Sequence, residues 1–305
     1  MAKSIPSSLG ILGGSGLYNM PEIRNAEWLY RESPFGEPSD HLLSGIIDNR
    51  SVKFIPRHGR THRLSPSDIN YRANIDVMKR SGCTELLSFS AVGSLREELS
   101  PGTFVIIDQF IDRTTQRACS FFGSGVVAHV GFSDPVCSRL GDIVEETARH
   151  LDIPYVRGGT YLVMEGPQFS TRAESFIHKS WGCSTIGMTG LPEAKLAREA
   201  ELCYCCIAMI TDYDCWHERY QAVSADHVAA SMANISNNAQ RLLAAIASSP
   251  DVHDPSCSCH FALDNAIMTA PEAYDAGMMK KLDAICARFN CSLPSAMKDE
   301  EELSS

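Results

Sequence analysis

The 305-residue chain lacks the segments that would send it into a membrane or out of the cell. No stretch approaches the roughly 20 consecutive apolar residues that a membrane-spanning helix needs. The first residues, Met-Ala-Lys-Ser-Ile-Pro, contain no apolar run of the kind that secretory signals carry. We therefore expect a cytoplasmic protein with no membrane partner.

The chain also lacks the positive charge of a nucleic-acid-binding protein. Its net charge is −10 at pH 7, which disfavours contact with polyanionic surfaces. An anionic small ligand would need positive groups gathered locally. Hydrophobic residues make up 44% of the chain and charged residues 21%, so we expect a packed core rather than disorder.

Cysteine is abundant, but the spacing typical of zinc ribbons is missing. The 12 cysteines are scattered, and no pair of CxxC motifs occurs. The nearest approach to a metal motif is Cys257-Ser-Cys259-His260, where only His253 lies nearby and two more ligands would be needed. We expect no metal site and, in a reducing cytosol, mostly small buried thiols.

A glycine cluster near the N-terminus matches none of the familiar nucleotide motifs. The segment GILGGSGL, residues 10–17, follows an apolar run. It is not GxGxxG, it lacks the Gly-Lys-Ser/Thr of a P-loop, and Leu17 replaces the last glycine of GxSxG. Two interpretations remain, a simple tight turn or a loop whose N–H groups and Ser15 hydroxyl surround an anion.

Short apolar runs alternate with helical patterns along the chain. We predict strands at residues 9–12, 52–56, 85–91, 103–108 and 207–211. Amphipathic periodicity predicts helices over 138–151 and 192–203, and a longer helix that Asp226 caps. This alternation indicates an α/β fold with a largely parallel or mixed sheet.

The C-terminal part differs in composition. Residues 248–261 are rich in Ser, Pro and Asp and are predicted to be a linker after a core of residues 1–247. Residues 262–291 are expected to pack on the core as a helical segment, mostly helical over 262–289 with a break near Pro271. Residues 292–305 form an acidic tail.

Two carboxylates follow the last predicted strand, in the motif TDYDCW at 211–216. Ligands of α/β proteins collect at the carboxyl ends of strands, and a spacing of two puts both side chains on one side of an extended segment. Asp212 and Asp214 therefore suit a ligand that offers N–H donors or needs a proton. A solvated loop with two ordinary surface acids is the alternative.

Other strand ends carry anion-binding groups. Arg57-His58-Gly59-Arg60 follows the strand at 52–56, and arginine matches phosphate geometry. Ser90 and Ala91 end another strand, and Thr189 precedes a helix whose first amides attract anions. Phe169 lies in a loop where it either stacks on a flat ring or packs in the core. The set suits a phosphate, a sugar and a base.

These motifs resemble those of the trimeric purine nucleoside phosphorylase family, especially its members that act on 5′-methylthioadenosine. The resemblance covers about residues 10 to 228. It rests on GILGGSGL, PRHGRTH, SPSDINYRANI, AVGSLREE, IIDQFIDRTT, EGPQFSTRAE, MTGLPEAKLAREA and TDYDCW, in this order. It implies an α/β, single-domain nucleoside phosphorylase fold, a central mixed β-sheet flanked by helices.

The resemblance also implies roles for individual residues. The positions that would hold phosphate are Ser15, Arg57, His58, Ser90, Ala91 and Thr189. Those that would contact the nucleoside are Phe169, Met188, Thr211, Asp212, Tyr213, Asp214 and Val228. Asp212 would face purine N7 and Asp214 the 6-amino group, as the catalytic pair. Ser170 and Ala225 fall where the family tunes specificity, and His129 where a residue reaches the neighbouring subunit's site.

The implied reaction is phosphorolysis of methylthioadenosine to adenine and 5-methylthioribose 1-phosphate, a step of purine and methionine salvage, in a homotrimer. Inorganic phosphate is the co-substrate, and no cofactor or metal is expected. The alternatives are a related purine nucleoside or methylthioinosine phosphorylase and a non-catalytic nucleoside- or phosphate-binding protein. Cys257 and Cys259 resemble a CxC disulfide of heat-stable archaeal members, and two free thiols fit the sequence equally.

Overall fold

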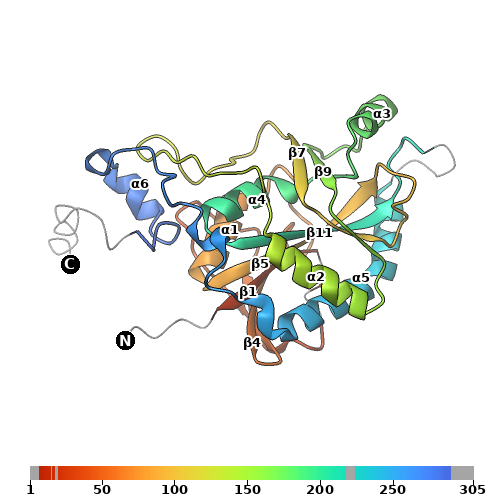
Figure 1. The fold of residues 1–305 in the computed structure, drawn as a ribbon, viewed down its shortest axis with the longest axis horizontal. Helices are drawn as coiled ribbons and strands as arrows, with labels where there is room; N and C mark the ends of the chain where they lie inside the picture. Colours follow the sequence, from red (N-terminus) through yellow and green to blue (C-terminus); the bar gives the residue numbers. More distant parts are fainter. Residues whose placement is uncertain (1–6, 15, 18–19, 218–223, 290–305) are drawn as a thin grey trace.

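The computed structural model of the chain describes residues 7–14, 16–17, 20–217 and 224–289. Within these residues, eleven strands form one mixed sheet in the order β2-β3-β4-β1-β5-β10-β9-β7, which β11, β6 and β8 extend from β5 (Figure 1). The strands are β1 (Ser8–Gly13), β2 (Arg24–Leu29), β3 (Leu42–Ile47), β4 (Arg50–Pro56), β5 (Cys83–Ser94), β6 (Phe104–Ile106), β7 (Gln109–Arg113), β8 (Tyr155–Arg157), β9 (Thr160–Met164), β10 (Thr185–Gly187) and β11 (Cys203–Asp212). The expected α/β class with a mixed sheet is confirmed.

Helices cover both faces of this sheet. The helices α1 (Tyr71–Arg80) and α4 (Gly190–Glu199) pack together on one face, whereas α2 (Ser138–His150) and α5 (Ala225–Ser248) pack together on the other. The short helices α3 (Arg172–Ser180) and α6 (Ala276–Lys281) lie at the periphery (Figure 1). Three 3₁₀ turns follow α5, namely η1 (Pro250–Val252), η2 (Ser258–Phe261) and η3 (Pro271–Ala273).

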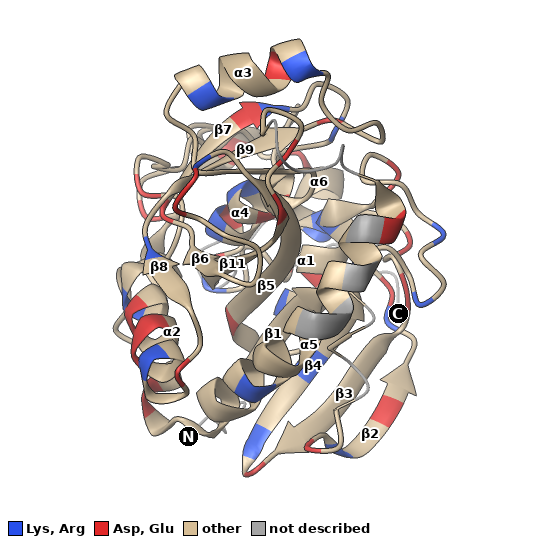
Figure 2. Cartoon of the chain, turned by 90° about the vertical axis from the view of Figure 1, so that its right-hand side faces the viewer, with Lys and Arg blue, Asp and Glu red and all other residues tan. Residues whose placement is uncertain are grey.

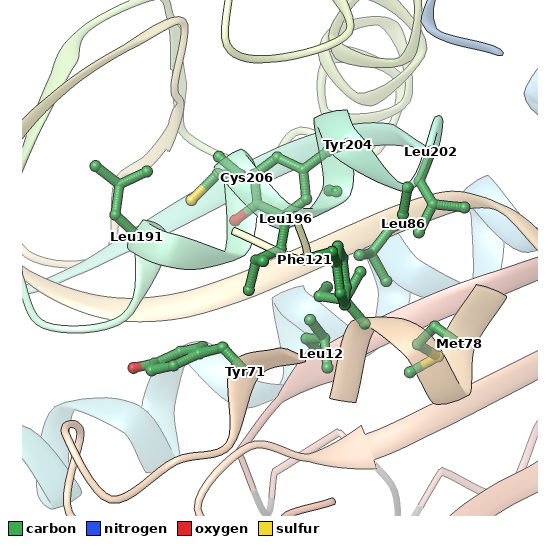
Figure 3. Packing of buried hydrophobic residues seen from close by; sticks show 14 of the residues in the cluster. Leu12, Tyr71, Met78, Leu86, Phe121, Leu191, Leu196, Leu202, Tyr204 and Cys206 are labelled. Carbon is green, nitrogen blue, oxygen red and sulfur yellow. The ribbon is translucent and has the colours of Figure 1, made fainter. Parts of the chain in front are cut away.

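Strand β11 shows why the sheet is sandwiched between two apolar layers. Its residues Tyr204, Cys206, Ala208 and Ile210 belong to the core cluster beneath α1 and α4, which Figure 3 shows from close by. The intervening residues Cys203, Cys205, Ile207 and Met209 belong to the cluster beneath α2 and α5. A strand that is buried on both faces has a continuous run of apolar residues in its sequence, and β11 has such a run.

The predicted strands all occur, and the helix expected over 138–151 is α2. Two helix ends differ from expectation. The helix α4 ends at Glu199 because Cys203 already opens β11, and α5 begins at Ala225, so Asp226 lies in its first turn instead of capping it.

The expectation that residues 262–289 are mostly helical is wrong. Apart from η3, only Ala276–Lys281 forms a helix there. Around residues 266–268 the main chain pairs with a distant loop: Ala266 accepts from the His129 amide at 2.8 Å, and the Met268 amide donates to Val127 at 2.8 Å. Long-range pairing therefore replaces helical pairing in this part of the segment. Figure 2 shows acidic and basic residues mixed along α2 and α3.

No helix among the described residues is long and apolar enough to cross a membrane. The expected division at residues 247, 261 and 291 stays a prediction. The acidic tail and Ser15 lie outside the described residues.

Candidate active site

Three neighbouring parallel strands deliver the predicted site residues to one edge of the sheet. Strand β5 pairs in parallel with β1 on one side and with β11 on the other. Their carboxyl ends therefore point the same way, and the loops after them meet there, as is usual for ligand sites in α/β proteins. Because β5 is 12 residues long, it runs past the end of β1 and spans the whole site.

One end of the site carries hydroxyl groups. The Ser90 and Thr189 hydroxyl oxygens lie 3.1 Å apart, on β5 and at the start of α4. Both residues are buried, and the Thr189 hydroxyl does not cap its own helix. An added Cβ at Gly14 would meet nothing within 4 Å, so the glycine-rich loop borders open space. Ala91, next to Ser90, is exposed.

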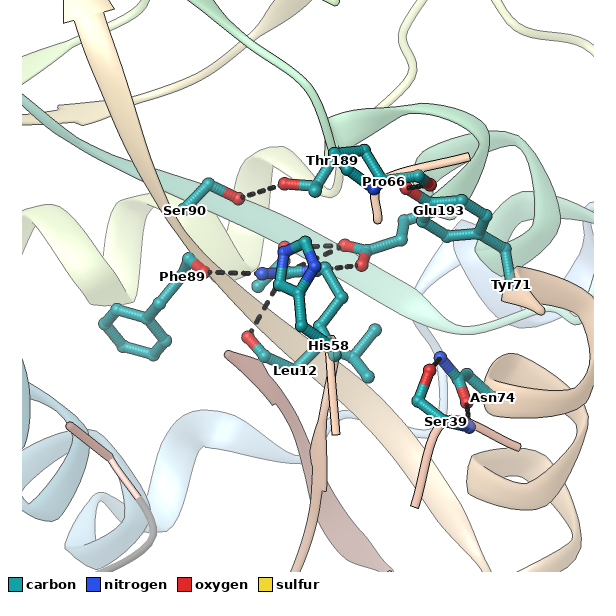
Figure 4. A network of polar contacts seen from close by, with 12 residues as sticks. Leu12, Ser39, His58, Pro66, Tyr71, Asn74, Phe89, Ser90, Thr189 and Glu193 are labelled. Carbon is teal, nitrogen blue, oxygen red and sulfur yellow. Dashed lines mark hydrogen bonds and ion pairs between the residues drawn. The ribbon is translucent and has the colours of Figure 1, made fainter. Parts of the chain in front are cut away.

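Arg57 ties this end of the site together. Its guanidinium donates to the main-chain oxygens of Phe89 at 3.0 Å and Leu12 at 3.3 Å, and to the Ser88 hydroxyl at 2.8 Å. It also forms a two-point ion pair with Glu193 of α4 (Figure 4). The side chain thus joins the end of β1 and the middle of β5 to the first turn of α4.

The charge of Arg57 is largely compensated inside the protein. Burial opposes its charged form, but the Glu193 carboxylate outweighs burial and raises the pKa of Arg57 above its ordinary value. The exposed fractions of the two side chains are 3% and 1%. A buried pair of this kind fixes geometry, and removing one partner leaves an unpaired buried charge.

The surroundings of His58 favour its neutral form. Its Nδ1 lies 2.9 Å from the Leu64 carbonyl oxygen, which only accepts, so Nδ1 carries the hydrogen and Nε2 is left with a lone pair. Burial lowers the pKa of His58 to about 4. Its ring stacks on that of His62 with the centroids 4.3 Å apart.

The two acids lie at the other end of the site. Asp212 ends β11 and accepts from the Thr211 hydroxyl at 2.7 Å and from the Asp214 amide at 2.9 Å. An added Cβ at Gly93 would lie 3.1 Å from Asp212 Oδ1 and 3.3 Å from Asp214 Cβ, so both acids pack on β5. Ser175 of α3 donates to Asp214 Oδ2 at 2.5 Å, and burial raises the pKa of Asp214.

Strand periodicity does not bring these two acids together, contrary to the expectation from their spacing. A spacing of two aligns side chains only on an extended strand, but β11 stops at Asp212 and a turn follows. Asp214 has a φ of +35°, which is unusual for a residue with a Cβ. The turn and the contact with Gly93, instead of strand periodicity, hold the acids near each other.

The loop at residues 165–170 approaches the same region. Its Gly166 is pressed against Met188, whose sulfur would lie 2.6 Å from an added Cβ. Phe169 is 44% exposed, so it is not part of the core. The Cys215 thiol donates to the Ser170 carbonyl at 3.2 Å, which joins this loop to the turn that carries the acids.

Arg117, which the sequence analysis did not single out, clamps these loops. Its side chain is 1% exposed and forms an ion pair with Glu165 at 3.2 Å. It also donates to the carbonyl oxygens of Met188 at 2.5 Å and Leu191 at 2.7 Å. Arg117 lies two residues after the motif IIDQFIDRTT, and this position was the sequence signal that could have identified it. Glu193 and Ser175 were likewise missed as partners of Arg57 and Asp214.

The remaining predicted positions are more scattered. Tyr213 is buried and donates to the Glu97 carbonyl at 3.0 Å, so its ring belongs to the scaffold. Ala225 is exposed at the start of α5, and Val228 is half-buried one turn further. His129 is exposed on the loop that pairs with residues 266–268.

The pairing register of β5 with β11 gives the distance between the two ends of the site. Ser90 pairs with Ala208 and Gly93 with Asp212, so three residue steps along β5 separate the hydroxyl end from the acid end. At about 3.3 Å per residue this is roughly 10 Å along the strand. The structure thus brings hydroxyls and acids to one edge at a separation that suits a small, elongated ligand.

Comparisons with known proteins agree on a family. The model of the phosphorylase superfamily matches residues 8–248. A protein named S-methyl-5′-thioadenosine phosphorylase from Rhodospirillum rubrum is 54% identical, over 92% of this chain and 96% of the relative. A relative of the same name from Bradyrhizobium diazoefficiens is 52% identical, over 92% of this chain and 97% of its own.

Solved structures give the same result. A methylthioadenosine phosphorylase from an antarctic soil metagenomic library superposes with a TM-score of 0.87 at 43% identity, over 93% of this chain and 99% of that chain. The methylthioadenosine phosphorylase from Schistosoma mansoni, in complex with adenine, superposes with a TM-score of 0.81 at 34% identity, over 86% of this chain and 99% of that one. The chain therefore belongs to the phosphorylase superfamily and, within it, to the family of the S-methyl-5′-thioadenosine phosphorylases.

Proposed function

We propose that this chain cleaves S-methyl-5′-thioadenosine with inorganic phosphate, releasing adenine and 5-methylthioribose 1-phosphate. One observation carries the proposal: hydroxyls and acids lie at opposite ends of a single edge of the sheet, roughly 10 Å apart along β5. Breaking the N-glycosidic bond leaves positive charge on the sugar and negative charge on the purine. An enzyme that speeds this reaction must act at both ends, and the site offers different chemistry at each.

At the phosphate end, Ser15, Ser90 and Thr189 donate hydroxyl hydrogens and Ala91 its amide. Arg57, whose charge Glu193 largely compensates, fixes the loops at this end in place. Burial, which lowers the pKa of His58 to about 4, favours its neutral form before phosphate arrives. A phosphate dianion beside it favours the imidazolium form, which can then donate from Nε2 while Nδ1 stays on Leu64.

At the base end, Asp212 shares a proton with purine N7, which makes adenine a better leaving group. Asp214, held by Ser175, accepts a hydrogen from the 6-amino group. Phe169 packs beside the purine, while Thr211 and Tyr213 hold the turn beneath it. Ser170 adjusts the choice of base from its contact with Cys215.

The sugar lies between these ends, over Met188, whose backbone Arg117 holds in place. Val228 and Ala225 border the 5′-methylthio group. A single apolar contact separates related substrates by only about 1–3 kcal/mol, so adenosine is expected to be a poor second substrate. His129 completes the site of a neighbouring copy in a cytoplasmic homotrimer, and phosphate is the only co-substrate that the reaction needs.

The decisive experiment measures adenine release with and without phosphate. Phosphate-dependent release together with 5-methylthioribose 1-phosphate supports the proposal. Faster cleavage of methylthioinosine than of methylthioadenosine would favour the related 6-oxopurine activity instead. Binding of the nucleoside without turnover would reveal a non-catalytic binding protein.

A further inference from the structure

Four cysteines that are far apart in the sequence converge at the amino end of β11. Cys137 precedes α2, Cys203 opens β11, and Cys257 and Cys259 lie on either side of the first residue of η2. Their four sulfur atoms all lie within 4.8 Å of one another. The sequence showed only the CxC pair, because the two other thiols come from positions more than 50 residues away.

The spacing of these sulfurs matches that of ligands around one ion. A tetrahedral Zn²⁺ with Zn–S bonds of about 2.3 Å separates its sulfur ligands by roughly 3.8 Å. The Cys137 and Cys257 sulfurs lie 3.7 Å apart. We propose that Cys137, Cys203, Cys257 and Cys259 bind one Zn²⁺ ion as a closed tetrathiolate site that is structural and separate from the catalytic site.

The surroundings of the sulfurs are built for negative charge. The Leu140 amide, in the first turn of α2, points at the Cys137 sulfur at 3.5 Å. Arg139 Nη2 lies 3.6 Å from Cys203 Sγ, and Arg198 Nη1 lies 3.6 Å from Cys259 Sγ. Four thiolates around Zn²⁺ carry a net charge of −2. Both guanidinium groups offset part of it, and Arg139 is shared with the Glu85 carboxylate at 3.6 Å. Such outer contacts orient ligands and tune a metal site.

The four thiols lie mostly out of solvent. Cys137, Cys203 and Cys259 are buried and Cys257 is half-buried. A structural zinc site is closed in this way, with all four ligand positions supplied by the protein.

A second set of ligands, Glu85, Cys203 and His260, also lies within 4.8 Å. The Glu85 carboxylate is less suited to the ion because it is already engaged. It accepts from Thr84 at 2.6 Å and contacts His253 at 3.2 Å and Arg139 at 3.6 Å. Soft thiolates are also the better ligands for zinc in a closed site. These groups therefore surround the ion without binding it.

The position of the site indicates what the ion does. Nine residue steps separate Cys203 from Asp212, or about 30 Å of strand, so the metal takes no part in catalysis. It joins residues 257–259 to α2 and β11. The chain beyond then pairs with the loop at 127–129, where Ala128 bridges to Ile267 next to His129. The ion thus fastens the C-terminal segment against the core.

The test uses the full chain, purified under reducing conditions and passed over a chelating resin. We expect one tightly held zinc per chain by elemental analysis, released by a mercurial that caps thiols. Cobalt exchanged for zinc should show the visible absorption and the sulfur-to-cobalt charge transfer of a tetrahedral thiolate site. These readouts do not depend on catalysis.

Variants localise the ion. Cys257→Ser and Cys259→Ser should lose the zinc and the cobalt spectrum and lower the unfolding temperature by more than about 5 °C. The matched control is Cys205→Ala, a buried cysteine on the same strand as Cys203, which should keep the metal. Wild-type chain that holds no zinc, or whose four thiols are found in two disulfides, would overturn the proposal. Zinc retained by both serine variants would overturn it too.

Discussion

The ion pair between Arg57 and Glu193 offers the sharpest test of how the phosphate end is built. In Glu193→Gln the shape of the side chain is kept and the negative charge is removed. Arg57 would then be a buried cation without a counter-charge, since only 3% of its side chain is exposed. Removing one partner of a buried pair costs about 3–5 kcal/mol. The hydrogen bonds to Phe89, Leu12 and Ser88 remain, so the lower part of this range is expected, about 3 kcal/mol.

Urea unfolding followed by circular dichroism measures this change in the free energy of unfolding. The matched control is Glu199→Gln, on the same helix and also buried. Burial raises the pKa of Glu199 to about 7, and its hydrogen-bond partners are Ser120 and the Phe121 amide. Neutralising Glu199 at pH 7 leaves no paired cation behind, so its cost should stay near 1 kcal/mol.

Glu193→Gln, which lowers the stability of the fold, should strengthen the binding of phosphate. Without Glu193, the charge of Arg57 is no longer compensated and the local potential becomes more positive. We expect the KM for phosphate to fall and added phosphate to restore more stability to the variant than to the wild type, by the linkage RT ln(1 + [L]/Kd). A loss of stability equal to that of Glu199→Gln, with an unchanged KM for phosphate, would refute the role given to this pair.

Three further predictions concern the acids and His58. Asp212→Ala should lower kcat by at least about 10²-fold with an unchanged circular dichroism spectrum, and near-normal adenine release would remove it from the proposed role. Asp214→Asn should move the ratio of kcat/KM towards methylthioinosine, because an amide can donate to a 6-oxo group. Since burial raises the pKa of Asp214, its ionised form costs folding energy at pH 7, so this variant should be no less stable than wild type. The pKa of His58 is lowered to about 4, so the unfolded chain takes up a proton first as the pH falls. Stability should drop between the ordinary histidine pKa of about 6.5 and pH 4, and less steeply in His58→Gln in pH-dependent urea titrations.

Sequence patterns predicted where the strands lie, for a physical reason, although β5 runs on to Ser94 instead of ending at Ala91. Apolar runs mark buried strands, and polar residues towards their carboxyl ends lie near a sheet edge. Ser90 and Thr189, almost 100 residues apart, were therefore expected in one site, and the structure brings their hydroxyls to 3.1 Å. The partners of such residues were harder to foresee. Glu193 looked like an ordinary acid in a first helical turn, and nothing local marks it as the counter-charge of Arg57.

Where prediction from sequence was incomplete, long-range contacts decided the outcome. Asp214 sits beside Asp212 because of a turn with positive φ and a close approach to Gly93, which strand periodicity does not describe. Residues 262–289 have helical composition, yet the main chain at Ala266 and Met268 finds its partners on a distant loop. The cluster around Cys203 likewise depends on three segments that only the folded chain brings together.

The alternation of β11 between two apolar layers limits how this protein can change. Deleting one residue inside the strand would exchange every side chain between the layers, so Tyr204 and its neighbours would meet cavities shaped for other groups. It would also turn Asp212 to the opposite side of the sheet and draw Cys203 away from its three partners. Loops around the site can gain or lose residues over evolutionary time. The length of β11 cannot change in this way, because Cys203 at one end and Asp212 at the other must both keep their positions.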